Sequence, residues 1–256
     1  MPIITNTSGL LSQTEHRPYP MPGRSWTMRQ TWHDLAFLHW PVPVAQLAAR
    51  IPAGLDLDLF EGEAWVGVVP FRMSGIRHRF GPAVPWISAF AELNVRTYVT
   101  DHKNRPGVLF FSLDAANPVA VAVARRWFHL PYFNARMRSR RIGKSVQYRS
   151  ERLHRDAGAA NFGAVYGPVQ PIRPAAKGSL EHWLTERYCL YTADRSGRLY
   201  RGDIHHLPWE LQIGQVELQR NSMTRSHGLE VSALPALVHF VRRIDVLVWS
   251  LDRVFS

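Results

Sequence analysis

Two apolar runs separated by a polar, turn-forming segment predict a long β-hairpin in the middle of the chain. The runs lie at 90–99 and 108–115, and the segment DHKNRPG, which contains proline and glycine, lies between them. Apolar runs of this length bounded by turn residues are typical of paired antiparallel strands. We therefore expect residues 85–115 to form a central hairpin around which the rest of the chain is arranged.

The first strand of this hairpin carries polar side chains on one face. Glu92, Asn94 and Arg96 are two residues apart, so in a strand they project from the same side, while Leu93 and Val95 project from the other. A carboxylate, an amide and a guanidinium in this arrangement form either a solvated rim or the polar floor of a pocket. We expect them to point into a cavity with aromatic walls.

The remaining pattern predicts short strands joined by turns. We expect these strands at 55–60, 64–71, 133–138, 145–154, 160–167, 188–192, 198–206, 211–219 and 238–251. About ten strands and about three helices favour an α+β fold, a predominantly antiparallel β-barrel or cone with a few helices.

The helices are expected to be short and clearly bounded. One should follow Pro41 and Pro43, and two others should follow Asn117 and Ser179, whose side chains can cap a helix N-terminus. Between the first helix and the central hairpin, the runs at 55–60 and 64–71 suggest another hairpin. A basic loop rich in glycine and proline would follow it at 72–86.

Length and composition bound the domain organisation. The chain has 256 residues, which suits one large β-rich domain or two small ones. Residues 1–25 are polar with several prolines, so we expect a flexible lead-in. Residues 26–256 contain no repeat, low-complexity tract or linker, and we expect them to form a single domain.

Cysteine content and hydropathy indicate a cytoplasmic protein. Cys189 is the one cysteine, so neither a disulfide scaffold nor a cysteine-rich zinc site is possible. The N-terminus lacks the basic and apolar regions of a signal peptide. The apolar stretch at 237–251 is broken by Arg242, Arg243 and Asp245 and falls short of the ~20 apolar residues of a membrane helix.

Several stretches resemble the YqjF-like family of uncharacterised bacterial proteins. They are FLHWPV at 37–42, AWVGVVPF at 64–71, ELNVRTYV at 92–99, GVLFFSLDA at 107–115, LPYF at 130–133 and RGDIHHLPWEL at 201–211. This family looks related in fold to acetoacetate decarboxylase. The resemblance implies a cone or barrel with a central pocket, and often a homo-oligomer.

The resemblance also indicates which chemistry the chain lacks. Decarboxylases of that type carry a Schiff-base lysine in a G-R-E-x-x-G-x-P-K pattern. The corresponding segment here is ARRWFHLPY, in which Tyr132 stands at the lysine position, and a phenol cannot form an imine. The acid of their Y-x-E pattern is retained as Glu92. We therefore expect Glu92 and Tyr132 to be catalytic if the protein is an enzyme, and expect no lysine-dependent decarboxylase.

Other candidates are weaker. Arg201 and His205 share a strand face, where they could bind a ligand together with Asn94 and Arg96. The chain has no HExxH, phosphate-binding loop or nucleophile elbow. We therefore expect neither a metal site nor a cofactor.

The charge of +11 leaves a second function open. Basic segments at 72–79 and 135–152 could bind nucleic acid or an anionic surface without catalysis. Such binders need aromatic residues among the basic ones, and Tyr148 is a single candidate in the second segment. We therefore favour a small-molecule pocket protein that acts on a carbonyl or carboxylate compound.

Overall fold

The computed structural model describes residues 7–84, 86–154 and 157–254. The described strands are β1 (Met28–Val42), β2 (Leu55–Leu57), β3 (Ala64–His78), β4 (Phe90–Asp101), β5 (Pro106–Ala115), β6 (Tyr132–Ile142), β7 (Ser145–Arg152), β8 (Asn161–Pro168), β9 (Cys189–Ala193), β10 (Leu199–His205), β11 (Gln212–Asn221) and β12 (Leu237–Arg253). The described helices are α1 (Thr7–Leu11), α2 (Val44–Ala48), α3 (Pro118–Trp127), α4 (Leu180–Thr185) and the 3₁₀ turn η1 (Arg225–His227).

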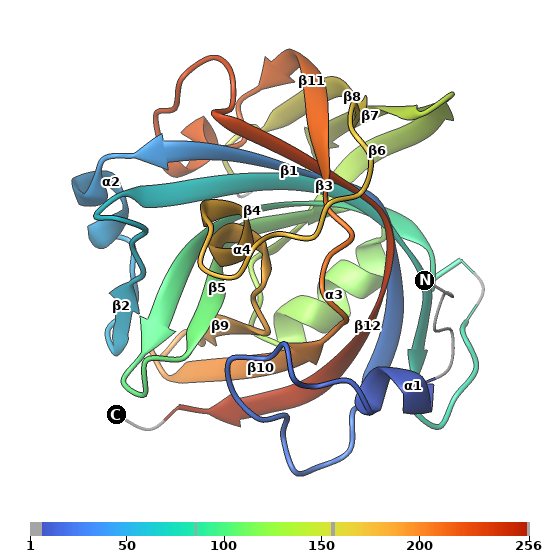
Figure 1. Cartoon of the computed structure of the whole chain (residues 1–256), viewed down its shortest axis with the longest axis vertical. Helices are drawn as coiled ribbons and strands as arrows, with labels where there is room; N and C mark the ends of the chain where they lie inside the picture. The colour runs from blue at the N-terminus through green and yellow to red at the C-terminus, as the bar shows by residue number, and fades with distance from the viewer. Residues whose placement is uncertain (1–6, 85, 155–156, 255–256) are drawn as a thin grey trace.

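The strands form one twelve-stranded sheet that pairs back on itself. Its order is β10-β9-β5-β6-β7-β8-β11-β12-β1-β3-β4-β2, with additional pairings of β10 with β12 and of β5 with β4. Two rings of strands result, and they share β12, β1, β3, β4 and β5. The smaller ring is completed by β9 and β10, and the larger one by β6, β7, β8 and β11 (Figure 1).

Most of the pairings are antiparallel. The exceptions are the short parallel contacts of β5 with β6 and with β9. The predicted α+β architecture with a large, predominantly antiparallel sheet is confirmed.

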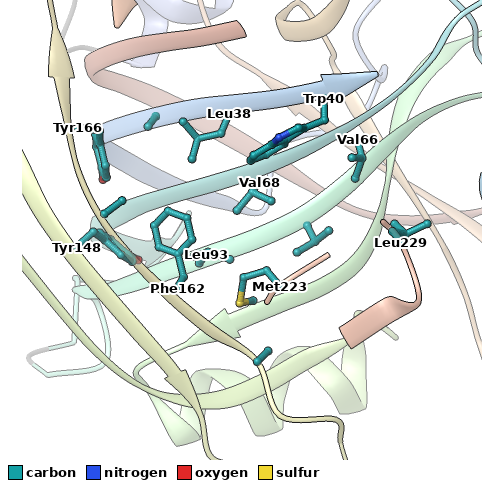
Figure 2. Close-up of a cluster of buried hydrophobic side chains, with 14 of the residues drawn as sticks. Leu38, Trp40, Val66, Val68, Leu93, Tyr148, Phe162, Tyr166, Met223 and Leu229 are labelled. Carbon is teal, nitrogen blue, oxygen red and sulfur yellow. The ribbon is translucent and has the colours of Figure 1, made fainter. Parts of the chain in front are cut away.

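The shared strands are buried on both faces, because each face lines a different ring. Leu93 of β4 packs with Leu38, Val66 and Val68 inside the larger ring, where they meet Tyr148 and other aromatic side chains of the opposite strands (Figure 2). The other face of the same strands turns toward the smaller ring and carries a second apolar cluster. Because Leu93 faces the larger ring, the alternating residues Glu92, Asn94 and Arg96 face the smaller ring.

The central hairpin and two helix starts are confirmed. β4 and β5 pair in antiparallel fashion from Glu92–Ala115 to Thr100–Pro106. Asn117 Oδ1 accepts hydrogen bonds at 3.1 Å from the amides that open α3. Ser179 caps α4 in the same way, at 3.3 Å. Side-chain caps of this kind stabilise a helix by about 1 kcal/mol.

Two expected features between α2 and the central hairpin are wrong. The run at 55–60 does not pair along 64–71. β3 already has β1 and β4 on its two edges. β2 pairs instead with residues 99–101 of β4, beyond the part of that edge that β3 covers, and the expected hairpin keeps a single bridge, Phe60–Glu63. The basic loop expected at 72–86 is shorter, because β3 continues to His78 along β1.

The described part of the N-terminal segment is packed, in contrast to the flexible lead-in expected for residues 1–25. Leu10 of α1 is 2% exposed and lies in a cluster with Trp26, Leu247 and Trp249. Arg17 Nη1 donates to the carbonyl oxygen of Ile204 on β10 at 2.7 Å. Residues 7–25 therefore cover the outer face of β10 and β12.

No helix in the described part of the chain combines the length and the apolar character of a membrane span.

Candidate functional site

A cavity of about 270 Å³ lies inside the smaller ring, between the shared strands and α3. Its aromatic walls include Trp32, Phe37, Phe71, Phe90, Phe110, Phe128, Trp209 and Trp249. Its polar groups include Glu92, Asn94, Arg96, Tyr132, Thr185 and Arg187. The alternation of β4 thus brings Glu92, Asn94 and Arg96 to one aromatic-walled cavity, as their spacing predicts.

Glu92 and Tyr132 form a buried pair at one end of this cavity. The Tyr132 hydroxyl donates to Glu92 Oε2 at 2.7 Å, and Glu92 is 3% exposed. Burial raises the pKa of Glu92 to about 8; the Tyr132 hydrogen bond lowers it, and the charge of Asp114 raises it. Burial, and then the Glu92 charge, raises the pKa of Tyr132 well above its ordinary value. At neutral pH, Glu92 is therefore mainly protonated and can donate a proton.

Tyr132 reaches Glu92 because of the turn after α3. His129 adopts a left-handed backbone conformation, with φ of 51°, and ends the helix region. Residues 130–132 then enter β6, where Tyr132 pairs with Leu113 of β5. Arg125 Nη1 donates to the Tyr132 carbonyl oxygen at 2.7 Å, which holds this turn against α3.

Arg96 provides a buried positive charge without a carboxylate partner among the described residues. Its Nη2 donates to the Leu184 carbonyl oxygen at 3.3 Å, and its guanidinium lies over the ring of Phe37 at 5.2 Å. The Nε atom of Arg96 and the Oδ1 atom of Asn94 are buried without a hydrogen-bond partner. Each unsatisfied buried polar group costs about 1–3 kcal/mol, so a ligand that pairs with them would be bound favourably.

Arg187 is a cavity residue that the sequence analysis did not single out. Its Nη1 donates to Asp58 Oδ2 at 2.5 Å and its Nε to the Trp183 carbonyl oxygen at 2.6 Å, while Nη2 has no hydrogen-bond partner in the described part of the chain. Burial lowers its pKa, and Asp58 opposes this shift. No local pattern in the sequence indicates its role, because Arg187 lies between α4 and β9 and reaches the cavity only through the packing of distant segments.

Arg201 and His205 lie on the opposite face of β10 and do not line the cavity. Gly202 and Ile204, which alternate with them, line it instead. Arg201 Nε donates to Asp203 Oδ2 at 2.9 Å, and His205 Nε2 lies 2.8 Å from the carbonyl oxygen of Leu10. The sequence shows that the two share a face. It does not show that residues 7–25 cover that face.

No lysine that could form a Schiff base is among the described residues that line the cavity. The chain contains three lysines, Lys103, Lys144 and Lys177, and all three are exposed and absent from the cavity lining. Within the described ranges, no group of three or more histidine, cysteine or carboxylate side chains could hold a metal ion.

The segments proposed for nucleic-acid binding gain no support from the structure. Residues 72–78 form the end of β3, and residues 135–152 form most of the β6–β7 hairpin. Tyr148 is fully buried, and its hydroxyl donates to the Glu92 carbonyl oxygen at 2.7 Å. It therefore cannot stack on a base.

The fold matches solved structures related to acetoacetate decarboxylase. Acetoacetate decarboxylase from Legionella pneumophila is 14% identical, with a TM-score of 0.61 and coverage of 93% of this chain and 92% of that chain. The enduracididine biosynthesis enzyme MppR complexed with pyruvate is 12% identical, with a TM-score of 0.63 and coverage of 89% and 90%. At these identities the match establishes the fold alone.

Sequence comparison gives a nearer relative. The uncharacterized protein YqjF of Bacillus subtilis (strain 168) is 46% identical over 233 residues, which is 91% of this chain and 95% of that protein. Residues 29–245 match the DUF2071 family, described as an uncharacterized conserved protein. The chain therefore belongs to the DUF2071 family, the family of YqjF, and shares its fold with acetoacetate decarboxylase.

Proposed function

We propose that the cavity binds a small compound carrying a carbonyl group and a carboxylate, and that the protein acts on it by proton transfer. The observation that carries this proposal is the polar face of β4 in an otherwise apolar cavity. Arg96, a cation without a carboxylate partner among the described residues, lies at one end of this face, and the protonated Glu92 lies at the other.

The separation of Glu92 and Arg96 along β4 suggests how a ligand would lie in the cavity. Glu92 and Arg96 are four residues apart on one strand, which puts their Cα atoms about 13 Å apart at ~3.3 Å per residue. Their side chains both line the cavity, and we expect one ligand to lie between them. A carboxylate would pair with Arg96 and its neighbour Asn94, and a carbonyl oxygen would lie beside Glu92 and Tyr132.

The chemistry follows from the protonation state of Glu92. A carboxylic acid with a pKa of about 8 can give its proton to a ligand carbonyl oxygen near neutral pH. The carboxylate that remains can then take a proton from the carbon next to that carbonyl group, which leaves the enol and restores the acid. The Tyr132 hydroxyl can stabilise the oxygen as negative charge develops there. Because the cavity has no amine, the proposed route does not use a Schiff base.

The structural neighbours support this ligand class. The MppR structure contains pyruvate, which carries a carbonyl group and a carboxylate. The acetoacetate decarboxylases are named for a substrate with the same two groups. The structural match covers about nine tenths of each chain. Because the sequence identity is low, no residue role is taken over from these proteins.

Binding is tested by thermal shift and calorimetric titration with small 2-oxo and 3-oxo acids and with the corresponding amides. We expect one or more acids, and not their amides, to stabilise the protein. Arg96→Met should raise the Kd at least about tenfold, because a charge-assisted hydrogen bond contributes about 1.5–3 kcal/mol. Arg201→Met, which changes an arginine outside the cavity, should leave the Kd unchanged. Equal binding of acids and amides, or equal loss in both variants, would contradict the proposal.

Proton transfer is tested on a bound acid by NMR. We expect the wild-type protein to exchange the hydrogens next to the carbonyl group with D₂O. Glu92→Gln should slow this exchange by about 10²–10⁴-fold, since it removes the proton donor. Glu230→Gln, which changes an exposed carboxylate, is the matched control. Exchange at the wild-type rate in Glu92→Gln would assign the reaction to another group.

A further inference from the structure

A second, larger hollow lies on the other side of α3. It is a groove of about 1100 Å³ whose charged lining is dominated by arginine. Val119, Ala120, Val123 and Ala124 of α3 face the cavity, whereas Val121, Ala122, Arg125 and Arg126 face the groove. The helix therefore separates two sites of different character, and Figure 1 shows it within the opening bounded by β5, β10 and β12.

Five arginines and one aspartate line this groove. They are Arg50, Arg125, Arg126, Arg195, Arg198 and Asp194. They come from three separate segments of the chain, so no local motif in the sequence indicates the site. Asp194 is paired with Arg198 at 2.8 Å, and the other four arginines have no carboxylate partner among the described residues. The lining therefore carries a large excess of positive charge.

Two of these arginines are held in place by neutral groups. Arg50 Nε donates to the His227 carbonyl oxygen at 2.9 Å, and Arg125 Nη1 donates to the Tyr132 carbonyl oxygen at 2.7 Å. These bonds orient the guanidinium groups without neutralising them. The guanidinium groups of Arg50 and Arg125 are therefore oriented by the protein without an ion-pair partner among the described residues.

Several orientable guanidinium groups suit a ligand with several negative charges in a small volume. Arginine binds phosphate oxygens in a bidentate manner, and its charge is retained at any ordinary pH. Phe111 and Phe133 add apolar surface beside the arginines. We propose that this groove binds the phosphate groups of a small polyanionic ligand.

The groove also borders the cavity. Phe110 and Leu130 line both hollows. Tyr132 faces the cavity, and the next residue, Phe133, faces the groove. A ligand in the groove would contact the turn that positions Tyr132, although phosphate binding there does not depend on the function proposed for the cavity.

The test is a calorimetric titration with pyrophosphate at a fixed ionic strength. The variant is Arg126→Gln combined with Arg195→Gln, because neither side chain makes an ion pair within the described structure. The control is Arg138→Gln combined with Arg140→Gln, two exposed arginines of β6 that lie outside the groove. Both variants lose the same charge. We expect the Kd to rise at least about tenfold in the first and to change less than about twofold in the second.

Each other outcome overturns the proposal. No binding, or equal loss in the two double variants, would mean that the charge of +11 attracts the anion without a site. Tighter binding of citrate than of pyrophosphate would assign the groove to carboxylates. Tighter binding of a random oligonucleotide, lost in the groove variant, would assign it to nucleic acid. Arg96→Met should leave pyrophosphate binding unchanged, which separates this result from the cavity proposal.

Discussion

Replacing Glu92 with glutamine should remove up to about 5 kcal/mol of pH dependence from the free energy of unfolding. The pKa of Glu92 rises from 4.5 to about 8 on folding, and each unit is worth about 1.36 kcal/mol. Below pH 4.5, the carboxyl is neutral in both states and has no effect. Between pH 4.5 and 8, the unfolded chain releases the proton and the folded one keeps it, so stability falls as pH rises.

The measurement compares two proteins because buried histidines act in the opposite direction. Burial lowers the pKa of His205 to about 4 and that of His206 to about 3, so both cause stability to fall as pH decreases below 6.5. Subtracting the urea-unfolding free energies of Glu92→Gln from those of the wild type cancels this contribution. We expect the difference to change by about 1.4 kcal/mol per pH unit within the window.

The control for this prediction is Glu230→Gln, at an exposed carboxylate. Its difference from the wild type should stay flat across the same pH range. A flat difference for Glu92→Gln as well would mean that Glu92 titrates as an ordinary carboxylate. That result would remove the proton donor from the proposed function.

Replacing Arg152 with methionine should cost about 3–5 kcal/mol of stability. Arg152 of β7 is paired with Asp114 of β5 at 2.7 Å, and their side chains are 2% and 0% exposed. The guanidinium also lies over the ring of Phe133 at 4.3 Å. Methionine keeps much of the apolar stem but leaves the Asp114 carboxylate buried without its counter-charge.

A second arginine pair provides the matched control. Arg136 of β6 forms an ion pair with Glu151 of β7, the residue next to Arg152. The side chains of this pair are 66% and 53% exposed. Arg136→Met should cost less than about 1 kcal/mol. Urea unfolding at neutral pH measures both. Comparable losses in the two variants would show that Asp114 does not need its partner.

Local sequence patterns predicted most of the elements, although not β1, and the central part of the site. The alternation of β4, the turn before β5 and the caps at Asn117 and Ser179 depend only on neighbouring residues. They can therefore be predicted from the sequence without knowledge of the fold. The same alternation placed Glu92, Asn94 and Arg96 on one face. The resemblance to a family added Tyr132, which no spacing rule connects with Glu92.

Long-range strand pairing decided the rest. β2 pairs with the end of β4 that extends beyond β3, and the closure of β10 on β12 joins strands that no turn connects. Period-two alternation shows that Arg201 and His205 share a face, but it does not say which face is enclosed. Residues 7–25 cover that face and make it as buried as the cavity side. The sequence by itself therefore determined which residues lie side by side on a strand, and the tertiary structure determined which of them meet across the cavity, because that depends on contacts between distant segments.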